Sequence, residues 1–302
     1  MSATQDRRMA SIALRLFSMV LMSSMLALVK IADMRGVAVV ESVFYRQFFA
    51  LPLVLIWVVR GGGFATVKTK RPFAHLWRMA LGMTGMVLNF SAYTLLPLAE
   101  ATTIGFTVPI FATILSAVLL GEATGWHRWS AVLLGFVGVL VMVNPGVDNH
   151  LPPAGVMVAI AASITIAGIT ITLRQIGRTE DTVTTVFWFT VTSLVPMGIA
   201  MIFFGKIHDP LTWVVLVAMG LVGGAAQLAM TASLRFAPVS VVLPMDYSSL
   251  LWATLLGWAL FDMLPSPTTW LGAPLIILSG LYIVYREHRL QRSQAMTAVT
   301  PD

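Results

Sequence analysis

The feature that most constrains this chain is a membrane-spanning pattern that occurs twice along its 302 residues. The apolar run 97–122 begins with Pro-Leu-Ala-Glu and ends with Leu-Gly-Glu, and the run 237–262 begins with Ala-Pro-Val-Ser and ends with Leu-Phe-Asp. Each is followed by a further apolar run that starts near a tryptophan, at 126–146 and 270–285. The chain is therefore expected to fold as two copies of one helical unit.

The composition favours a bilayer protein. Apolar residues make up 58% of the chain and charged residues 11%, against roughly a quarter charged in soluble domains. The net charge of +6 comes from basic residues that flank the apolar runs, a pattern unlike the basic stripe of a nucleic-acid-binding surface. Because the chain has no cysteine, disulfides and thiolate metal sites are excluded.

Ten runs approach the roughly 20 mostly apolar residues that a bilayer crossing requires. They lie near 11–32, 41–60, 74–96, 99–120, 127–143, 153–173, 182–204, 212–235, 239–261 and 268–285. The basic start of the first run is similar to a signal peptide, but ten crossings require it as a retained span. Ten spans place both termini on one side of the membrane.

Lysine and arginine set the orientation, because they are retained on the cytoplasmic side of short loops. With the amino terminus inside, 15 of the 19 Lys and Arg residues fall on the inner side, 3 fall on the outer side, and Arg46 lies within a span. Both termini are predicted to be cytoplasmic.

The predicted domain boundary lies in the polar, Pro- and Gly-containing join that begins at Asn144. The first repeat covers 1–146 with five spans, and the second covers 147–302 with five spans and a short tail. Since five is odd, the second repeat enters the membrane from the opposite face. The predicted fold is an all-α integral membrane protein of two inverted five-helix repeats, an architecture of secondary transporters.

The order and spacing of these segments resemble the drug/metabolite transporter superfamily, specifically the ten-helix bacterial carriers with two EamA-type repeats. The resemblance rests on the segments 96–101, 106–111, 120–122 and 144–146, with Pro-Met-Asp-Tyr-Ser at 244–248. It implies a multi-pass protein of the bacterial inner membrane that moves small organic metabolites. Among the branches, exporters of amino acids, including aromatic ones, are the most similar.

Two cations within the spans are candidate substrate ligands. A charge at the bilayer centre costs on the order of 3 kcal/mol, so it needs a partner, an aqueous cavity or an interface. Lys30 either reaches the headgroups at the outer end of its span or contributes to the site. Arg46 either pairs with Glu41 at the outer interface or meets a substrate carboxylate in an outer vestibule.

Amides and aromatic residues are further candidates. Asn89 and Gln227 fall at nearly equivalent places in the two repeats, near mid-membrane. They form either interhelical hydrogen bonds or a binding site at the repeat interface. Tyr93, Tyr247 and Trp252 lie within spans and either pack in the core or stack on a flat substrate.

Asp246 is the carboxylate predicted to lie well inside a span. It either couples transport to protons, binds a substrate ammonium, or pairs statically with Arg235. Pro244 removes a backbone donor just before it and disturbs the helix, as Pro109 and Pro196 do in their spans. Such breaks are tolerated where they line a cavity or are covered by protein.

The predicted function is a secondary transporter that works by alternating access and exports amino acids. The alternative is uptake or exchange of another metabolite, such as a nucleotide-related compound or drug. An enzyme is not expected, because the histidines fall at span ends, and neither a channel filter nor a P-loop occurs. We expect no cofactor and no metal. The expected partners are membrane lipids and a small-molecule substrate, and nucleic acid is not among them. A monomer is one assembly that the sequence allows.

Overall fold

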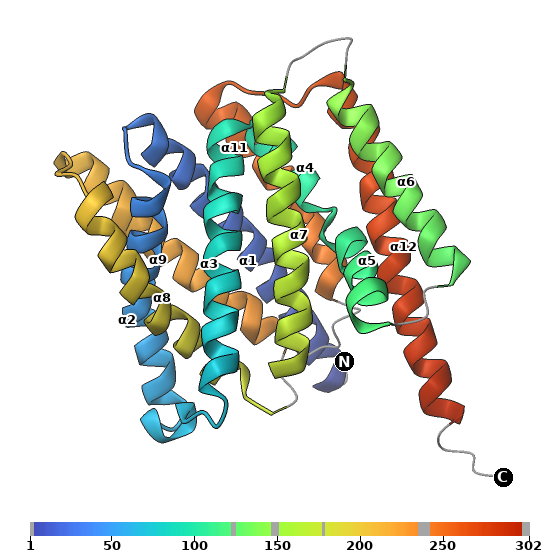
Figure 1. The fold of residues 1–302 in the computed structure, drawn as a ribbon, viewed down its shortest axis with the longest axis horizontal. Coiled ribbons are helices and arrows are strands. Elements are labelled where there is room, and N and C mark those ends of the chain that lie inside the picture. The colour runs from blue at the N-terminus through green and yellow to red at the C-terminus, as the bar shows by residue number, and fades with distance from the viewer. Residues whose placement is uncertain (1–2, 122–124, 146–150, 177–178, 235–241, 298–302) are drawn as a thin grey trace.

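The computed structural model describes residues 3–121, 125–145, 151–176, 179–234 and 242–297, and these residues form a helical bundle (Figure 1). The first half contains α1 (Ala3–Met34), α2 (Val39–Arg60), η1 (Phe64–Val67), α3 (Pro72–Leu95), α4 (Leu98–Gly105), α5 (Val108–Leu120) and α6 (Trp126–Val143). The second half contains α7 (Pro153–Ile176), α8 (Thr182–Phe204), α9 (Pro210–Ser233), η2 (Leu243–Tyr247), α11 (Ser248–Phe261) and α12 (Pro267–Thr297).

Two of the predicted spans are broken. The fourth divides into α4 and α5 just before Pro109, and the described part of the ninth contains the short 3-10 helix η2, which includes Pro244, ahead of α11. These breaks confirm the expectation for the two prolines, which remove a backbone donor. The expectation for Pro196 was wrong, because α8 continues through it as one helix.

Local chemistry accounts for several helix ends. Pro72 and Pro210 stand in the first turns of α3 and α9, where a missing backbone donor is not needed. Asp209 caps α9 by accepting hydrogen bonds from the backbone of Leu211 and Thr212. Gly121 ends α5 in the left-handed conformation that glycine adopts without strain.

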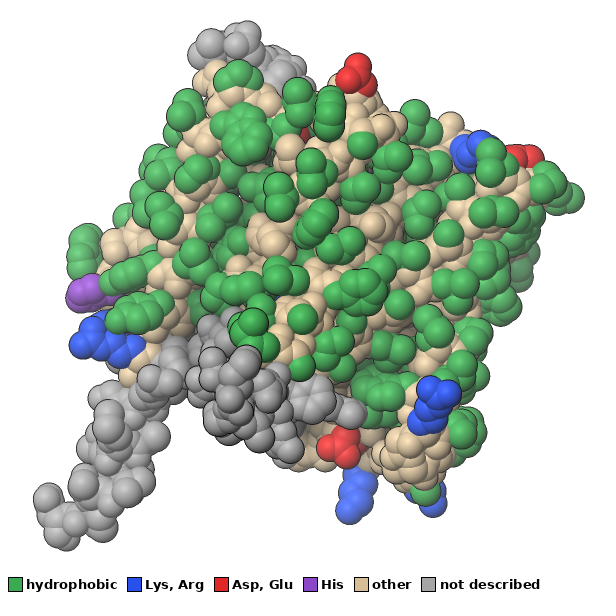
Figure 2. Space-filling view, turned by 180° about the vertical axis from the view of Figure 1, so that it is seen from behind, with side chains coloured by type: hydrophobic (Ala, Val, Ile, Leu, Met, Phe, Trp, Pro, Cys, Tyr) green, Lys and Arg blue, Asp and Glu red, His purple; other side chains and the backbone are tan. Residues whose placement is uncertain are grey.

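The exterior matches a lipid environment. Within the described residues, eight helical stretches are long and apolar enough to cross a membrane, and α3 and the η2–α11 pair correspond to the other two of the ten predicted crossings. Figure 2 shows hydrophobic side chains over the middle of one face, with charged side chains toward its upper and lower edges. Large apolar side chains such as Ile202 and Phe203 are strongly exposed, as expected for residues that contact lipid tails.

The helix contacts carry the repeat symmetry. The counterparts are α1 and α7, α2 and α8, α3 and α9, and α5 and α11. Three contacts between the halves therefore have an equivalent: α1–α9 corresponds to α7–α3, α2–α9 to α8–α3, and α1–α11 to α7–α5. All six contacts occur. The pairs α2–α8 and α6–α12 map onto themselves. Within the described residues, α1, α2 and α3 contact one another more extensively than α7, α8 and α9 do. The two halves therefore share a plan but differ in packing.

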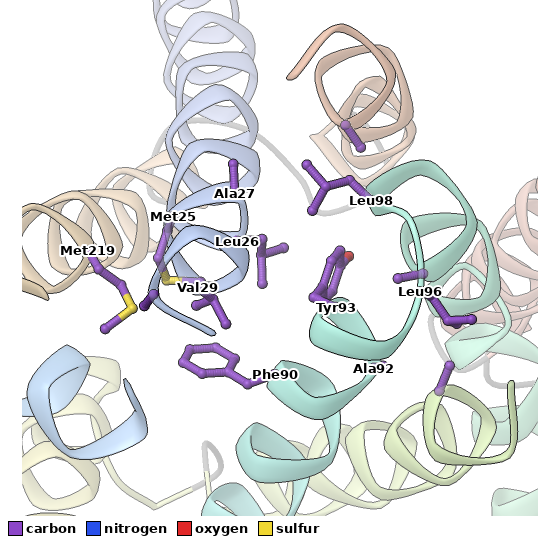
Figure 3. Close-up of a cluster of buried hydrophobic side chains, with 14 of the residues drawn as sticks. Met25, Leu26, Ala27, Val29, Phe90, Ala92, Tyr93, Leu96, Leu98 and Met219 are labelled. Carbon is purple, nitrogen blue, oxygen red and sulfur yellow. The ribbon is translucent and has the colours of Figure 1, made fainter. Parts of the chain in front are cut away.

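The main hydrophobic core lies at one end of the bundle, around the end of α1 and the ends of α3 and α4 (Figure 3). Leu26, Phe90, Leu96 and Leu98 are buried there, and Tyr93 packs beside them. We call this end of the molecule the opposite face, and the end where α1 begins and α2 joins α3 the N-terminal face. The core closes the bundle at the opposite face.

Candidate functional site

A cavity of about 480 Å³ lies between helices of both repeats. Its walls come from α1, α2 and α3 of the first half and from α7, α8 and α9 of the second. It runs from Glu180 and Leu234 near the N-terminal face to Met25 and Phe90, which belong to the core at the opposite face. We call this space the first cavity.

Three predicted site residues, Arg46, Asn89 and Gln227, line the first cavity together. Asn89 and Gln227 each lie six residues before the end of a 24-residue helix, in α3 and α9. The two helices run in opposite directions, and each amide lies about 9 Å from the end of its helix at 1.5 Å per residue. The predicted equivalence of the two positions along their helices holds, and their depth in the membrane stays a prediction.

Arg46 does not take the partner that its spacing suggested. Its guanidinium donates to the side-chain oxygen of Gln47, whose amide donates to the Ser193 hydroxyl at 2.7 Å. Glu41 instead accepts hydrogen bonds from the Lys206 backbone amide at 2.9 Å and from the backbone of Ala38 at 2.8 Å. Its carboxylate also lies 3.0 Å from the ring nitrogen of His208.

Arg78 is a cavity residue that the sequence reasoning missed. It lies early in α3 and was counted there as an orientation signal, yet its side chain lines the first cavity. The guanidinium carbon lies 4.3 Å from the centre of the Phe189 ring, within cation–π distance. In the sequence, the only indication that Arg78 lines a cavity was its position in the second turn of an amphipathic span.

A second cavity, of about 520 Å³, lies on the other side of α7 toward α5, α6 and α12. Ile166 and Met230 line both cavities and separate them. The broken segments of the fourth and ninth spans border this space through Pro109 and Pro244. This is the setting in which irregular backbone is tolerated within a membrane.

Asp246 lies in the second cavity and forms an ion pair with Arg15. The Arg15 Nε and Nη2 atoms lie 2.5 Å and 2.6 Å from the two carboxylate oxygens, a bidentate arrangement that favours strong charge-assisted bonds. Arg235, the partner considered from sequence, lies outside the described residues. The pair joins α1 of the first repeat to η2 of the second.

Tyr247 also lines the second cavity, with its ring centre 4.8 Å from that of Phe106. Tyr93 and Trp252 line neither cavity. Tyr93 is buried in the core, and its hydroxyl lies 3.0 Å from that of Thr102. The structure thus brings Tyr247 to a cavity wall and places Tyr93 in the packed end of the bundle.

Lys30 takes a role that neither sequence alternative described. It is 7% exposed, and its ammonium donates to the carbonyls of Tyr93 at 3.2 Å and Leu96 at 2.7 Å. These carbonyls lie at the carboxyl end of α3, where cations are favourable. Reaching the headgroups was the wrong expectation, because the side chain turns inward to cap a helix.

Two buried carboxylates fasten the opposite face. Glu41, at the start of α2, binds the α8–α9 connection as described above. Glu100, in α4, accepts hydrogen bonds from the Ser266 backbone and the Thr269 hydroxyl at the start of α12, each at 3.1 Å. Each carboxylate joins the first repeat to the second, so polar contacts reinforce the apolar closure.

Among the described residues, no group of three histidines and carboxylates is placed to hold a metal ion. What the structure presents is a multi-pass helical protein with two cavities inside the membrane region, the layout of a transporter. The chain belongs to the EamA-like transporter family, which it matches over residues 9–144 and again over 153–286.

Characterised relatives are small-metabolite transporters. The chain is 28% identical over 255 residues to an S-adenosylmethionine uptake transporter of Rickettsia prowazekii, covering 84% of this chain and 85% of the relative. It is 27% identical over 255 residues to a riboflavin transporter of Rhizobium johnstonii, covering 84% of each. A solved crystal structure matches with a TM-score of 0.61 at 20% identity, covering 93% of this chain and 98% of that one, and supports the fold. This protein is therefore a transporter of small metabolites.

Proposed function

We propose that the protein is an uptake or exchange carrier for a nucleotide-related metabolite, with S-adenosylmethionine as the leading candidate. The relatives named as an S-adenosylmethionine uptake transporter and as a riboflavin transporter support this substrate class. The first cavity, at about 480 Å³, falls within the range of roughly 300–1,000 Å³ typical of small-molecule sites. Amino-acid export, the principal expectation from sequence, receives no support from these relatives.

The observation that carries the proposal is the first cavity itself. Helices of both repeats build it, amides and a cation line it, and the packed core ends it at the opposite face. A cavity that reaches toward one face and is closed at the other corresponds to one state of an alternating-access cycle. Rocking of the repeats would open the opposite end and close the N-terminal end.

The orientation completes the proposal. The excess of Lys and Arg around the N-terminal face favours the cytoplasmic side for that face. In a bacterial inner membrane, the described state would then be open inward, with both termini in the cytoplasm. Because the sequence has no P-loop, a solute gradient or an exchanged solute supplies the energy.

The test is uptake of labelled S-adenosylmethionine, riboflavin or tryptophan into liposomes that contain the purified chain. Each solute is measured with and without the same unlabelled solute inside. Saturable S-adenosylmethionine uptake that preloading stimulates is the expected result. Uptake of tryptophan alone would replace the proposal with the amino-acid carrier, and riboflavin uptake alone would move the substrate to the flavins.

A matched control keeps the result specific. Gly224 lines the first cavity, and a side chain there would meet Leu53 and Ala50 at about 3 Å. Gly224→Leu is expected to abolish uptake by crowding the cavity wall where α9 meets α2, whereas Gly125→Ala, at the exposed start of α6 with a negative φ and open space around it, leaves the cavity unchanged. A folded Gly224→Leu protein that transports normally would place the site elsewhere.

A further inference from the structure

The first cavity contains a buried cation that has no counter-charge. Arg46 is 6% exposed and lines the cavity wall. Within the described residues, no carboxylate lies within ion-pair distance of it, and its Nε atom has no hydrogen-bond partner. Its one described side-chain partner, Gln47, is a neutral amide that is itself held by Ser193.

The nearest sequence candidate for a counter-charge is occupied. Glu41 is fully buried one and a half turns earlier in α2, where its two oxygens serve the amides of Ala38 and Lys206 and the ring of His208. Those contacts lie at the opposite face, beyond the closed end of the cavity. Arg46 therefore directs an unneutralised charge into the cavity.

Such a charge is costly without an anion. A guanidinium inside the bilayer costs on the order of 3 kcal/mol on insertion scales, and the uncharged Gln47 contact offsets only part of that cost. Gly223 leaves the space that the Arg46 Nε and the Met25 sulfur occupy, since a Cβ there would meet them at 3.2 Å and 2.6 Å. The packing thus holds the cation at the deep end of the cavity.

The other charged side chains of the cavity wall also leave it positively charged. Arg78 lines it nearer the N-terminal face and rests on Phe189, and its Nε and Nη1 atoms have no partner among the described residues. The one described carboxylate in the wall, Glu180, accepts hydrogen bonds from the Thr69 hydroxyl at 2.8 Å and the Lys70 backbone at 3.1 Å. It also lies 3.8 Å from His75.

We propose that Arg46 is the anion-binding residue of the transport site, and that the transported solute carries a carboxylate that enters the first cavity to meet it. This inference rests on the proposed function and names the substrate chemistry of the same site. A single carboxylate matches the single unneutralised charge at the deep end. Gln47 and Ser193 act as positioning residues that orient the guanidinium, and Arg78 attracts the anion on its way in.

The experiment compares two competitors, one with and one without the amino-acid group that carries the carboxylate, and the Arg46 variants then test whether the carboxylate is the group that matters. S-adenosylhomocysteine carries the amino-acid carboxylate, and 5′-methylthioadenosine lacks the amino-acid group. Each is added against labelled S-adenosylmethionine uptake in liposomes that contain the full chain. The carboxylate-bearing competitor is expected to inhibit at a concentration at least about tenfold lower, as a charge-assisted hydrogen bond implies.

Variants assign that preference to Arg46. In Arg46→Gln the preference is expected to vanish, and in Arg46→Lys, which keeps the charge without the forked geometry, it is expected to shrink but persist. Arg60→Gln, at the exposed other end of α2, is the matched control and keeps the full preference. Equal competition in the unaltered chain, or an unchanged preference in Arg46→Gln, overturns the inference.

A second measurement separates this inference from the proposed function. If the unaltered chain takes up no S-adenosylmethionine, the proposal that it transports this solute is overturned. The purified protein is then tested for thermal stabilisation by indole-3-acetate and by indole-3-acetamide. Stronger stabilisation by the acid, lost in Arg46→Gln, supports the anion site independently of the nucleoside. Equal stabilisation by the two solutes overturns it.

Discussion

The two ends of the bundle differ in how they treat polar groups. At the opposite face, Glu41, Glu100 and Lys30 are buried, and each is hydrogen-bonded across helices. Toward the N-terminal face, Arg78 borders open space with nitrogen atoms that lack partners among the described residues. At the closed end, buried polar groups bridge helices, with only the Glu100 Oε2 atom among these three side chains left without a partner, whereas the unpaired nitrogen atoms of Arg78 border the space that a solute can enter.

The two ends are expected to differ most in how readily a reagent in solution reaches an introduced cysteine. The natural chain has no cysteine, so a single introduced thiol reports its own environment. Ile169→Cys, in the first cavity, should react fully with a membrane-impermeant maleimide from the N-terminal face, whereas Ala27→Cys, 1% exposed in the core, should stay protected. Faster labelling of Ala27→Cys would mean that the opposite face is the open one.

Breaking the Arg15–Asp246 pair should give the largest loss of stability. Removing one partner of a fully buried pair costs about 3–5 kcal/mol, and the loss here should fall near or below the lower end of that range because the Asp246 side chain is 31% exposed. Thermal unfolding of Arg15→Ala in detergent measures the loss. The double variant Arg15→Ala/Asp246→Ala should recover part of it, and additive losses would show that the pair itself contributes little.

Weakening the closed end should cost less stability but shift the conformation. Glu100→Ala loses the charge-assisted hydrogen bonds that Glu100 accepts from Ser266 and Thr269, worth about 1.5–3 kcal/mol. Labelling of Ala27→Cys in this background should rise, because the closed state has lost a contact between the repeats. Unchanged labelling would separate Glu100 from the closure.

Neutralising Arg78 should change stability least among the buried residues. Arg78→Met removes a cation–π contact and also a poorly compensated charge, so the net change is expected to stay within about 1 kcal/mol. Transport, in contrast, should fall. A variant that unfolds readily would make Arg78 a structural residue and remove the contrast between the two ends.

The smallest effect is expected at the exposed cap of α9. Hydrogen bonds from the Thr212 hydroxyl and backbone, with help from Arg35, hold the pKa of Asp209 below its usual value of 3.8. A lowered folded-state pKa means that the cap stabilises the protein above pH 3.8, and that this contribution is lost as the pH falls toward the lowered value. In Asp209→Asn, stability measured by thermal unfolding should fall less steeply as the pH drops below 3.8.

Much of the fold followed from the sequence, because span length and hydropathy are local properties. The ten predicted runs correspond to the helices and to the α4–α5 and η2–α11 pairs. Pro109 and Pro244 marked real breaks, whereas Pro196 did not. The chemistry of a proline is local, but whether neighbouring helices preserve the helix around it depends on packing.

The site was harder to predict because side-chain partners depend on packing between distant segments. Equivalent positions in the repeats correctly paired Asn89 with Gln227. Arg15 and Arg78 were treated as orientation signals, since both lie within the first turns of their spans. Their roles depend on contacts with η2 and α8, which are separated from them by more than a hundred residues and leave no trace in hydropathy.

The intertwined contacts of the two halves also bear on how such a chain could arise. Since α1 packs on α9 and α3 packs on α7, neither half encloses an interior by itself. An ancestral five-helix unit would have required a second copy, inserted upside down, to form any compartment. Once one gene encoded both copies, each was free to specialise: Arg15, Arg46 and Arg78 now belong to the first, and Asp246 belongs to the second.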